Sequence, residues 1–273
     1  MALVYFHAGG GWSSHAFSTR LRVLKLAKRE TRIEQQSARM KVPPPAKPPV
    51  ASLILGVLSL IGMMISLWMI FLYAPTEEVE GNAQRIFYFH VPMAWIGMLA
   101  FVILAIASIA YIISKDERWD WVARAAAESG AVFITLATIL GSIWGKTTWG
   151  TWWSWDPKLT AVLVMWFMYI AYIMLRSYMG RTTSSAYSGA VLAIVGVIDV
   201  PIIYLSVVWW RTLHPGPEVA SGDLPASVVL TLMVSLLTFT LFYSFLMIQL
   251  YQLQKVQAQA ERLRAGVEYG FDE

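Results

Sequence analysis

The sequence contains no cysteine. Disulfides, thiolate metal sites and any cofactor attachment through cysteine within this chain are therefore excluded. Charged residues are also scarce, at 14% of the 273 residues, whereas 57% of the residues are hydrophobic. This balance is typical of an integral membrane protein and not of a soluble domain.

The net charge of +4 and the pI near 9.2 could suggest a nucleic-acid partner. Most of the basic excess, however, lies in the first fifty residues and in short connections between apolar segments. Membrane topology explains this distribution better, so no nucleic-acid partner is expected.

Six apolar segments reach or exceed the roughly 20 residues that a helix needs to cross a bilayer. The gaps between them leave no room for a globular domain outside the membrane. The sequence therefore predicts an all-α integral membrane protein, a bundle of six transmembrane helices with short loops. The expected spans are residues 50–74, 89–114, 122–144, 159–179, 186–210 and 226–251.

The distribution of lysine and arginine predicts the orientation. With the N-terminus in the cytoplasm, seventeen of these residues lie inside and only four lie outside, namely Arg85, Lys146, Lys158 and Arg211. This positive-inside bias predicts that both termini are cytoplasmic. We expect residues 1–47 to be a disordered or loosely helical cytoplasmic extension, residues 48–252 the transmembrane domain and residues 253–273 a cytoplasmic tail. We also expect Met40 to begin the functional chain.

The outside loop at residues 144–158 holds an unusual concentration of tryptophan. An aromatic belt spreads one or two aromatic residues over each helix end, so this concentration favours a platform for a flat ligand. Plain anchoring at the membrane surface is the alternative. If the loop is helical, its residues at i, i+3, i+4 and i+7 share one face, and these are Trp149, Trp152, Trp153 and Asp156. The other two tryptophans are Trp144 and Trp155.

Two histidines lie on the same side as these tryptophans. His90, in RIFYFHVPMAW, is at the mouth of the second helix, and His214, in VVWWRTLHPGPE, follows the fifth helix. The positive end of a helix dipole favours a neutral imidazole, which is the form that binds a metal. One interfacial histidine is usually only a hydrogen-bonded boundary residue. Two histidines around an aromatic platform indicate a shared ligand.

The remaining charged residues allow more than one interpretation. Asp156, followed by Pro157, is predicted to be the N-cap of the fourth helix. The outside cations could pair with carboxylates of a ligand, although interfacial snorkelling accounts equally well for each one alone. Asp199 lies near mid-membrane beside Pro201. It is either a protonated carboxyl bonded to the kinked backbone or part of a proton relay.

A flat apolar molecule that carries carboxylates and is held by two imidazoles describes haem. His90 and His214 would be the axial ligands of the iron, and Arg85 and Arg211 would lie near the propionates. Trp149, Trp152, Trp153 and Trp155 would form the platform. Because the histidines lie at helix mouths, the site would be at the outer surface and not within a transmembrane electron-transfer cytochrome.

The motifs RIFYFHVPMAW, WGKTTWGTWWSWDPKLT and VGVIDVPIIYLSVVWWRTLHPG resemble those of the haem exporter protein C (CcmC) family, and the resemblance spans residues 50–251. The middle motif is similar to the WWD signature of a wider haem-handling group that includes CcmF and the CcsA-type synthases. The resemblance implies that the WWD loop and the flanking His90 and His214 bind haem b transiently, without a covalent bond, at the periplasmic surface of the inner membrane.

The same resemblance implies the partners. Haem would pass to the chaperone CcmE, and the protein would work with CcmD and with the ABC transporter subunits CcmA and CcmB. It would hold and present haem, so it is not expected to be an enzyme. Two rival functions stay open: a CcsA-like or CcmF-like haem-lyase component of cytochrome c synthesis, and a proton-coupled permease built around Asp199.

Overall fold

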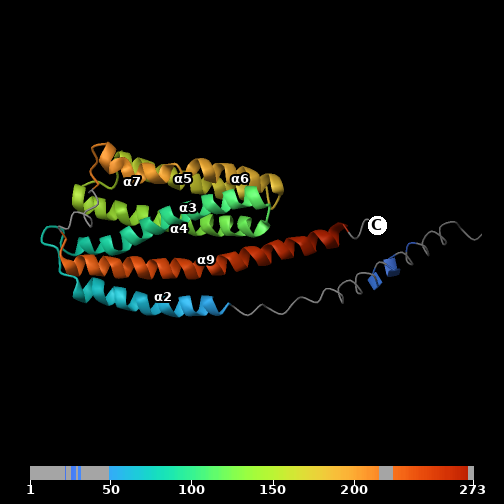
Figure 1. Cartoon of the computed structure of the whole chain (residues 1–273), viewed down its shortest axis with the longest axis horizontal. Helices are drawn as coiled ribbons and strands as arrows, with labels where there is room; N and C mark the ends of the chain where they lie inside the picture. Colours follow the sequence, from blue (N-terminus) through green and yellow to red (C-terminus); the bar gives the residue numbers. More distant parts are fainter. Residues whose placement is uncertain (1–21, 23–25, 29, 32–48, 215–223, 270–273) are drawn as a thin grey trace, which may run out of the picture. The chain divides into compact units, whose positions relative to one another are not determined.

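The computed structural model describes residues 22, 26–28, 30–31, 49–214 and 224–269. The expectations for residues 1–47 and for Met40 therefore lie almost entirely outside the described residues. Pro49–Glu273 is a compact unit of its own, and its helices run side by side as a bundle (Figure 1).

Six helical segments of this unit are long and apolar enough to cross a bilayer, which confirms the predicted all-α membrane protein with six spans. Three spans combine two helical pieces. The spans are α2 (Val50–Trp68) with the π-helical turn η1 (Met69–Tyr73); the 3-10 helix η2 (Asn82–Ile86) with α3 (Phe87–Ser114); α4 (Glu117–Trp149); α5 (Pro157–Tyr178); α6 (Thr183–Gly196) with α7 (Asp199–Trp209); and α9 (Ala226–Tyr269).

The third span is longer than predicted, and this changes the tryptophan-rich loop. The helix α4 continues to Trp149, and Gly150 ends it in a left-handed conformation with φ 76°, as is common at a helix C-terminus. The non-helical loop is therefore residues 150–156 and not 144–158. The predicted helical face that combined Trp149 with Trp152 was wrong, because Gly150 terminates the helix between them.

Two further boundaries differ from the expectation. The helix α9 continues to Tyr269, so residue 252 lies inside a helix and does not separate a tail from the bundle. The fifth span is interrupted at residues 197–198, immediately before Asp199. Turn-like hydrogen bonds replace the helical pattern there, from Ile198 N to Val195 O and from Val200 N to Val197 O.

Close packing of α3, α4 and α5 forms the core that supports both ends of the bundle. The Tyr169 hydroxyl, buried on α5, donates to the Gly97 carbonyl of α3 at 2.7 Å. A Cβ added at Gly130 of α4 would lie 2.1 Å from that hydroxyl oxygen, so only glycine fits there. This packing places the first turn of α3, which carries His90, directly against the last turns of α4.

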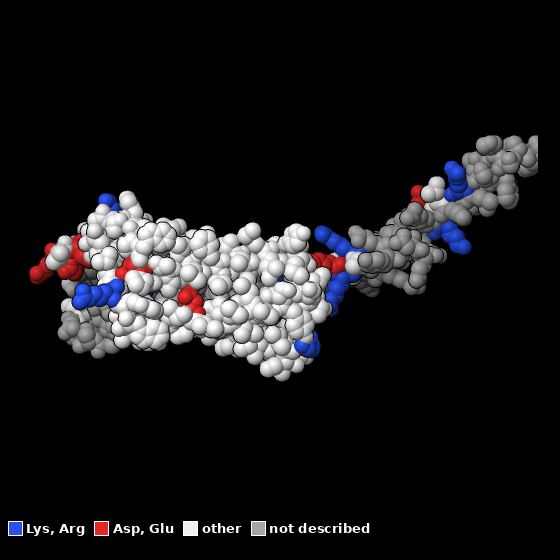
Figure 2. Space-filling model, turned by 90° about the horizontal axis from the view of Figure 1, so that it is seen from above, with Lys and Arg blue, Asp and Glu red and all other residues white. Residues whose placement is uncertain are grey.

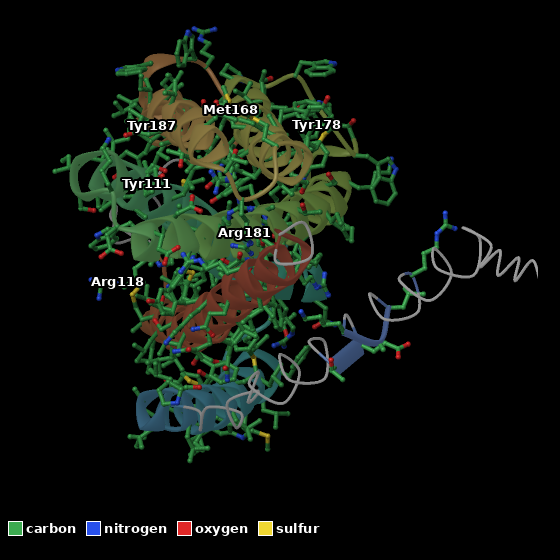
Figure 3. The ribbon with its side chains drawn as sticks, turned by 90° about the vertical axis from the view of Figure 1, so that its right-hand side faces the viewer. Tyr111, Arg118, Met168, Tyr178, Arg181 and Tyr187 are labelled. Atoms are coloured by element: carbon green, nitrogen blue, oxygen red, sulfur yellow. The ribbon has the colours of Figure 1, made fainter. Side chains whose placement is uncertain are left out.

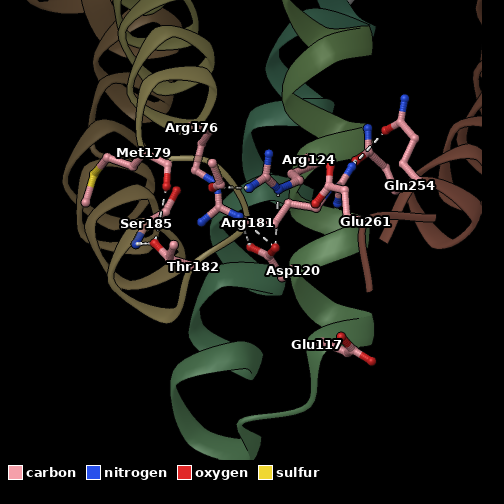
Figure 4. A network of polar contacts seen from close by, with 12 residues as sticks. Glu117, Asp120, Arg124, Arg176, Met179, Arg181, Thr182, Ser185, Gln254 and Glu261 are labelled. Carbon is pink, nitrogen blue, oxygen red and sulfur yellow. Dashed lines mark hydrogen bonds and ion pairs between the residues drawn. The ribbon is translucent and has the colours of Figure 1, made fainter. Parts of the chain in front are cut away.

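Charged residues are few on the visible surface between the ends of the bundle (Figure 2). At the end where α3 stops and α4 starts, which we call the arginine end, Arg118 and Arg181 are labelled in Figure 3. A network of ion pairs joins the helices there (Figure 4). Asp120 of α4 accepts from Arg176 of α5 at 2.6 Å and pairs with Arg124 at 3.3 Å. Arg181 bonds to Gln254 at 2.6 Å and pairs with Glu261 at 3.1 Å, both in α9.

We predict that Asp120→Asn destabilises the bundle by about 3–5 kcal/mol, because the Arg176 side chain, only 2% exposed, would lose its carboxylate partner. Thermal unfolding of the detergent-solubilised protein would measure this loss. Asp116→Asn is the matched control. Its ion pair with Arg118 is exposed, and asparagine caps a helix as well as aspartate does, so stability should change little. Equal effects of the two substitutions would contradict the prediction.

Candidate functional site

His90 lies in the first turn of α3, where its ring is held against α4. Its Nδ1 is 2.9 Å from the carbonyl oxygen of Ala137. A carbonyl only accepts a hydrogen bond, so Nδ1 carries the hydrogen and the lone pair is on Nε2. A Cβ at Gly141 would lie 2.8 Å from the His90 Cε1, so this glycine makes room for the ring. The tautomer is therefore the one in which Nε2 can bind a metal.

Trp144, near the end of α4, contacts His90. The two rings pack edge to face with their centroids 5.9 Å apart, and Phe87 packs on the same indole at 5.8 Å. The indole nitrogen donates to the carboxylate of Glu80 at 2.9 Å. The indole of Trp144 is therefore held in place beside His90. The hydrogen bond that holds it is accepted by Glu80, which lies in the connection between the first two spans.

Asp156 is the N-cap of α5, as predicted, with Pro157 in the first helical position. Its Oδ1 accepts from the Lys158 amide at 3.0 Å. The carboxylate also accepts from the Thr212 hydroxyl and from the Leu213 amide, both at 2.7 Å. Burial by itself would raise the pKa of Asp156, but the hydrogen bonds from Thr212, Leu213, Lys158 and the Leu159 backbone outweigh it and hold this pKa below its ordinary value. One ionised carboxylate thus joins α5 to the segment that leads to His214.

His214 lies beside Trp149 and Lys158. The ring centroids of Trp149 and His214 are 6.4 Å apart in an edge arrangement. The Lys158 ammonium is 3.3 Å from Nδ1 of His214. The charge of Lys158 also acts on the His90 ring, so both histidines have this lysine in their surroundings.

The two predicted histidines therefore share Lys158 as a neighbouring charge, whereas the predicted tryptophans are divided. Trp144 and Trp149, both on α4, each pack against one histidine. The other three follow in the loop. Trp152 and Trp155 are 60% and 76% exposed, and Trp153 packs edge to face on Trp155 at 5.9 Å. The large exposed indoles of Trp152 and Trp155, in the loop that follows Trp149, are a surface on which a flat ligand could lie.

Arg85 is bound to the end of the first span. Its guanidinium donates to the Ile70 carbonyl, to Thr76 Oγ1 at 3.3 Å and to Asn82 Oδ1 at 3.1 Å. The guanidinium therefore satisfies a backbone carbonyl at the end of the first span, in addition to any role toward a ligand. Arg85 also lines a pocket of about 450 Å³ next to the His90 turn, whose walls are Phe71, Asn82, Arg85, Ile86, Phe89 and Leu140.

The other predicted cations are placed differently. Arg211 follows the edge-packed pair Trp209 and Trp210, is exposed, and forms no ion pair with the described residues. Lys146 donates to the Gly150 carbonyl at 2.8 Å and so stabilises the C-terminus of α4. Lys158 contacts a predicted ligand residue, His214.

Neither intramembrane acid belongs to this site. Glu128 accepts from Gln254 at 2.8 Å, in contact with the network of the arginine end. Asp199 begins α7, and its Oδ2 is buried with no hydrogen-bond partner among the described residues. The expected bond from this carboxyl oxygen to kinked backbone is not formed there.

Six membrane-crossing helices with a histidine and tryptophan site at one end define a multi-pass helical membrane protein. Comparison with known proteins identifies its family. Residues 48–266 match the family model "Heme exporter protein C". This chain belongs to the heme exporter protein C family.

Individual relatives agree with this assignment. The chain is 38% identical to heme exporter protein C of Bradyrhizobium diazoefficiens over 173 residues, which is 62% of this chain and 66% of the relative. It is 34% identical to the protein of that name from Haemophilus influenzae over 194 residues, 70% and 78% of the two chains. A putative cytochrome c biosynthesis ccmC-like mitochondrial protein of Marchantia polymorpha is 31% identical over 188 residues, 69% and 76% of the two chains.

Sequence reasoning missed two residues of the site, Glu80 and Thr212, and one contact each of Asp156 and Lys158. Glu80 and Thr212 carry no motif that points to a partner, because Trp144 and Asp156 are 64 and 56 residues away in the chain. The predicted role of Asp156 was limited to capping, whereas it also holds the His214 segment. Lys158 was weighed as a partner for ligand carboxylates, but its contact with His214 depends on the bundle.

We predict that Asp156→Asn loosens the His214 segment, because an amide has one acceptor oxygen in place of two. Hydrogen exchange at the Leu213 amide should become about 10- to 100-fold faster, as expected for loss of a hydrogen bond to a charged group. Thr212→Val, which removes only the hydroxyl donor, should have a smaller effect. Unchanged exchange at Leu213 in Asp156→Asn would contradict this role.

Acid should have the same effect as the amide substitution. The pKa of folded Asp156 lies below its ordinary value of 3.8, so its stabilisation is fully present above pH 3.8 and is lost as the pH falls through the folded pKa. The contribution of this carboxylate to the exchange protection of the Leu213 amide should therefore stay constant from neutral pH down to pH 3.8. A loss of the carboxylate contribution near neutral pH would contradict the assignment.

Proposed function

We propose that this protein binds haem between His90 and His214 at the tryptophan-rich end of the bundle and delivers it for cytochrome c maturation. The names of its relatives, heme exporter protein C and a ccmC-like protein of cytochrome c biosynthesis, support this proposal. The observation that carries it is the bond from Nδ1 of His90 to the Ala137 carbonyl, because it leaves Nε2 with the lone pair that an iron ligand needs.

Further features of the site fit haem. The two histidines provide nitrogen donors, and Trp149 with the exposed Trp152 and Trp155 provides an apolar surface for a porphyrin. Arg85 and Arg211 are proposed to lie near the propionates, as is Lys158. For Arg85 this means sharing a guanidinium that already bonds to Ile70 and Asn82. The haem is proposed to be haem b, bound without a covalent bond and only in transit.

The cellular setting belongs to the same proposal. The seventeen to four distribution of lysine and arginine supports cytoplasmic termini and a haem site on the periplasmic face of the inner membrane. The recipient of haem is proposed to be the chaperone CcmE, and CcmD, CcmA and CcmB the assembly partners. In this role the protein binds and presents haem and carries out no catalytic turnover.

A second function is kept for Asp199 because its Oδ2 is buried without a described partner at a break in the fifth span. A proton-coupled permease would use such a carboxyl. That function predicts loss of transport in Asp199→Asn and full activity in His90→Ala. The haem proposal predicts instead that His90→Ala weakens haem binding and that Asp199→Asn leaves it unchanged.

We predict that His90→Ala and His214→Ala each lower the affinity for ferric haem at least tenfold, about 1.4 kcal/mol. The wild-type protein, purified in detergent and titrated with haemin, should give the spectrum of a six-coordinate low-spin iron, and each variant a high-spin spectrum. Co-expression with CcmE and detection of haem bound to the chaperone test delivery. A wild-type protein that shows no Soret band even with CcmE would overturn the proposal.

We predict that Trp152→Ala and Trp155→Ala weaken haem retention by about 2- to 10-fold each, the range expected for loss of one aromatic contact. Both indoles are largely exposed, so folding and membrane insertion should be unaffected. Haemin affinity and the amount of protein in the membrane fraction are the two measurements. Loss of insertion with normal haemin affinity would favour the anchoring role instead.

A further inference from the structure

The two histidines of the site differ in what holds them. Nδ1 of His90 meets a backbone carbonyl, which only accepts, whereas Nδ1 of His214 meets the Lys158 ammonium, which only donates. In His214, Nδ1 must therefore be the acceptor, and in the neutral ring the hydrogen is on Nε2. With one nitrogen engaged by the ammonium and the other protonated, the ring presents no lone pair to a metal.

Lys158 is half-buried and forms no ion pair within the described part of the chain. The carboxylate nearest to it in sequence is Asp156, whose oxygens are directed to the Lys158 amide, Thr212 and Leu213. A partly desolvated ammonium whose side-chain partner, among the described residues, is an imidazole is stabilised strongly when a carboxylate reaches it.

One carboxylate, Asp156, holds both of the segments that carry Lys158 and His214. Asp156 fixes both the start of α5, which carries Lys158, and the segment of Thr212 and Leu213, which leads to His214. The lysine and the histidine are thus held opposite one another by one carboxylate. Their contact is therefore a consequence of how the site is built and not of a chance meeting of two side chains.

We propose that Lys158 is a positioning residue that keeps His214 from binding iron until a carboxylate of the incoming ligand draws the ammonium away. This rests on the proposed haem function and adds an order of events to it. His90 binds the iron first, the ligand carboxylate takes Lys158, and His214 then completes the coordination. The imidazole stays neutral throughout: its hydrogen leaves Nε2 for solvent water, and one hydrogen is taken up from water at Nδ1.

The ligand carboxylates and Lys158 can be removed separately. Ferric protoporphyrin IX (haemin) carries two free carboxylates, and its dimethyl ester carries none. With haemin the full-length wild-type protein should reach the six-coordinate low-spin state. With the ester it should stop at a high-spin state that depends on His90 alone. Lys158→Met should bind the ester in the six-coordinate low-spin state, and it should bind haemin about tenfold more weakly because a charged hydrogen bond is lost.

Two control variants separate this role from a general effect of charge or folding. Lys158→Arg keeps a donor and a positive charge, so it should behave as wild type and remain high-spin with the ester. Lys146→Met removes an exposed cation that bonds to the Gly150 carbonyl, and it should also behave as wild type. A stabilising role of Lys158 alone would lower the amount of folded protein without changing the coordination of the ester complex.

The possible outcomes decide between the proposals. A low-spin wild-type complex with the ester overturns the role of Lys158, and this result does not depend on whether Lys158→Met folds. A high-spin ester complex of Lys158→Met overturns it as well. A wild-type protein that binds haemin without any effect of His90→Ala or His214→Ala overturns the proposed haem site itself, which is a different result.

Discussion

The carboxylate of Asp156 is the interaction on which the candidate site depends. It accepts at the N-terminus of α5 and, with hydrogen bonds of 2.7 Å, from Thr212 and Leu213 beyond α7. Because it is buried, each lost bond would leave a charged oxygen without compensation. This single group sets where the tryptophan-rich loop ends, where α5 begins and where His214 lies. The position of Lys158 opposite His214 follows from the same constraint.

The site has two halves built on different physical supports. The half around His90 is supported by close helix packing, in which Gly141 leaves space for the imidazole and the Ala137 carbonyl orients it. The half around His214 is supported by hydrogen bonds to a loop carboxylate and by a lysine. Packed helices are rigid and loops less so, and a rigid first ligand with an adjustable second one suits a protein proposed to take up and release haem.

Particular residues explain what could be read from the sequence. The spans were predictable because twenty consecutive apolar residues are a local property, and the Asp156-Pro157 cap was predictable because its signature is also local. The end of α4 was misplaced because the apolar run ends near Trp144, and the end of an apolar run does not end a helix. Gly150 does, through a backbone conformation that glycine adopts readily. Arg85 was expected to face a ligand, yet much of its donor capacity serves the end of the first span.

The sequence by itself determined the class of protein, the six spans, the two histidines and the tryptophans between them, because composition and motif are properties of the chain. Only the tertiary structure decided which atoms meet. His90 reaches Ala137 across 47 positions, and Lys158 reaches His214 across 56. Hydrogen bonds act over about 3 Å, so these two bonds form only when segments far apart in the chain lie side by side. The tautomer of each histidine is therefore a property of the folded bundle.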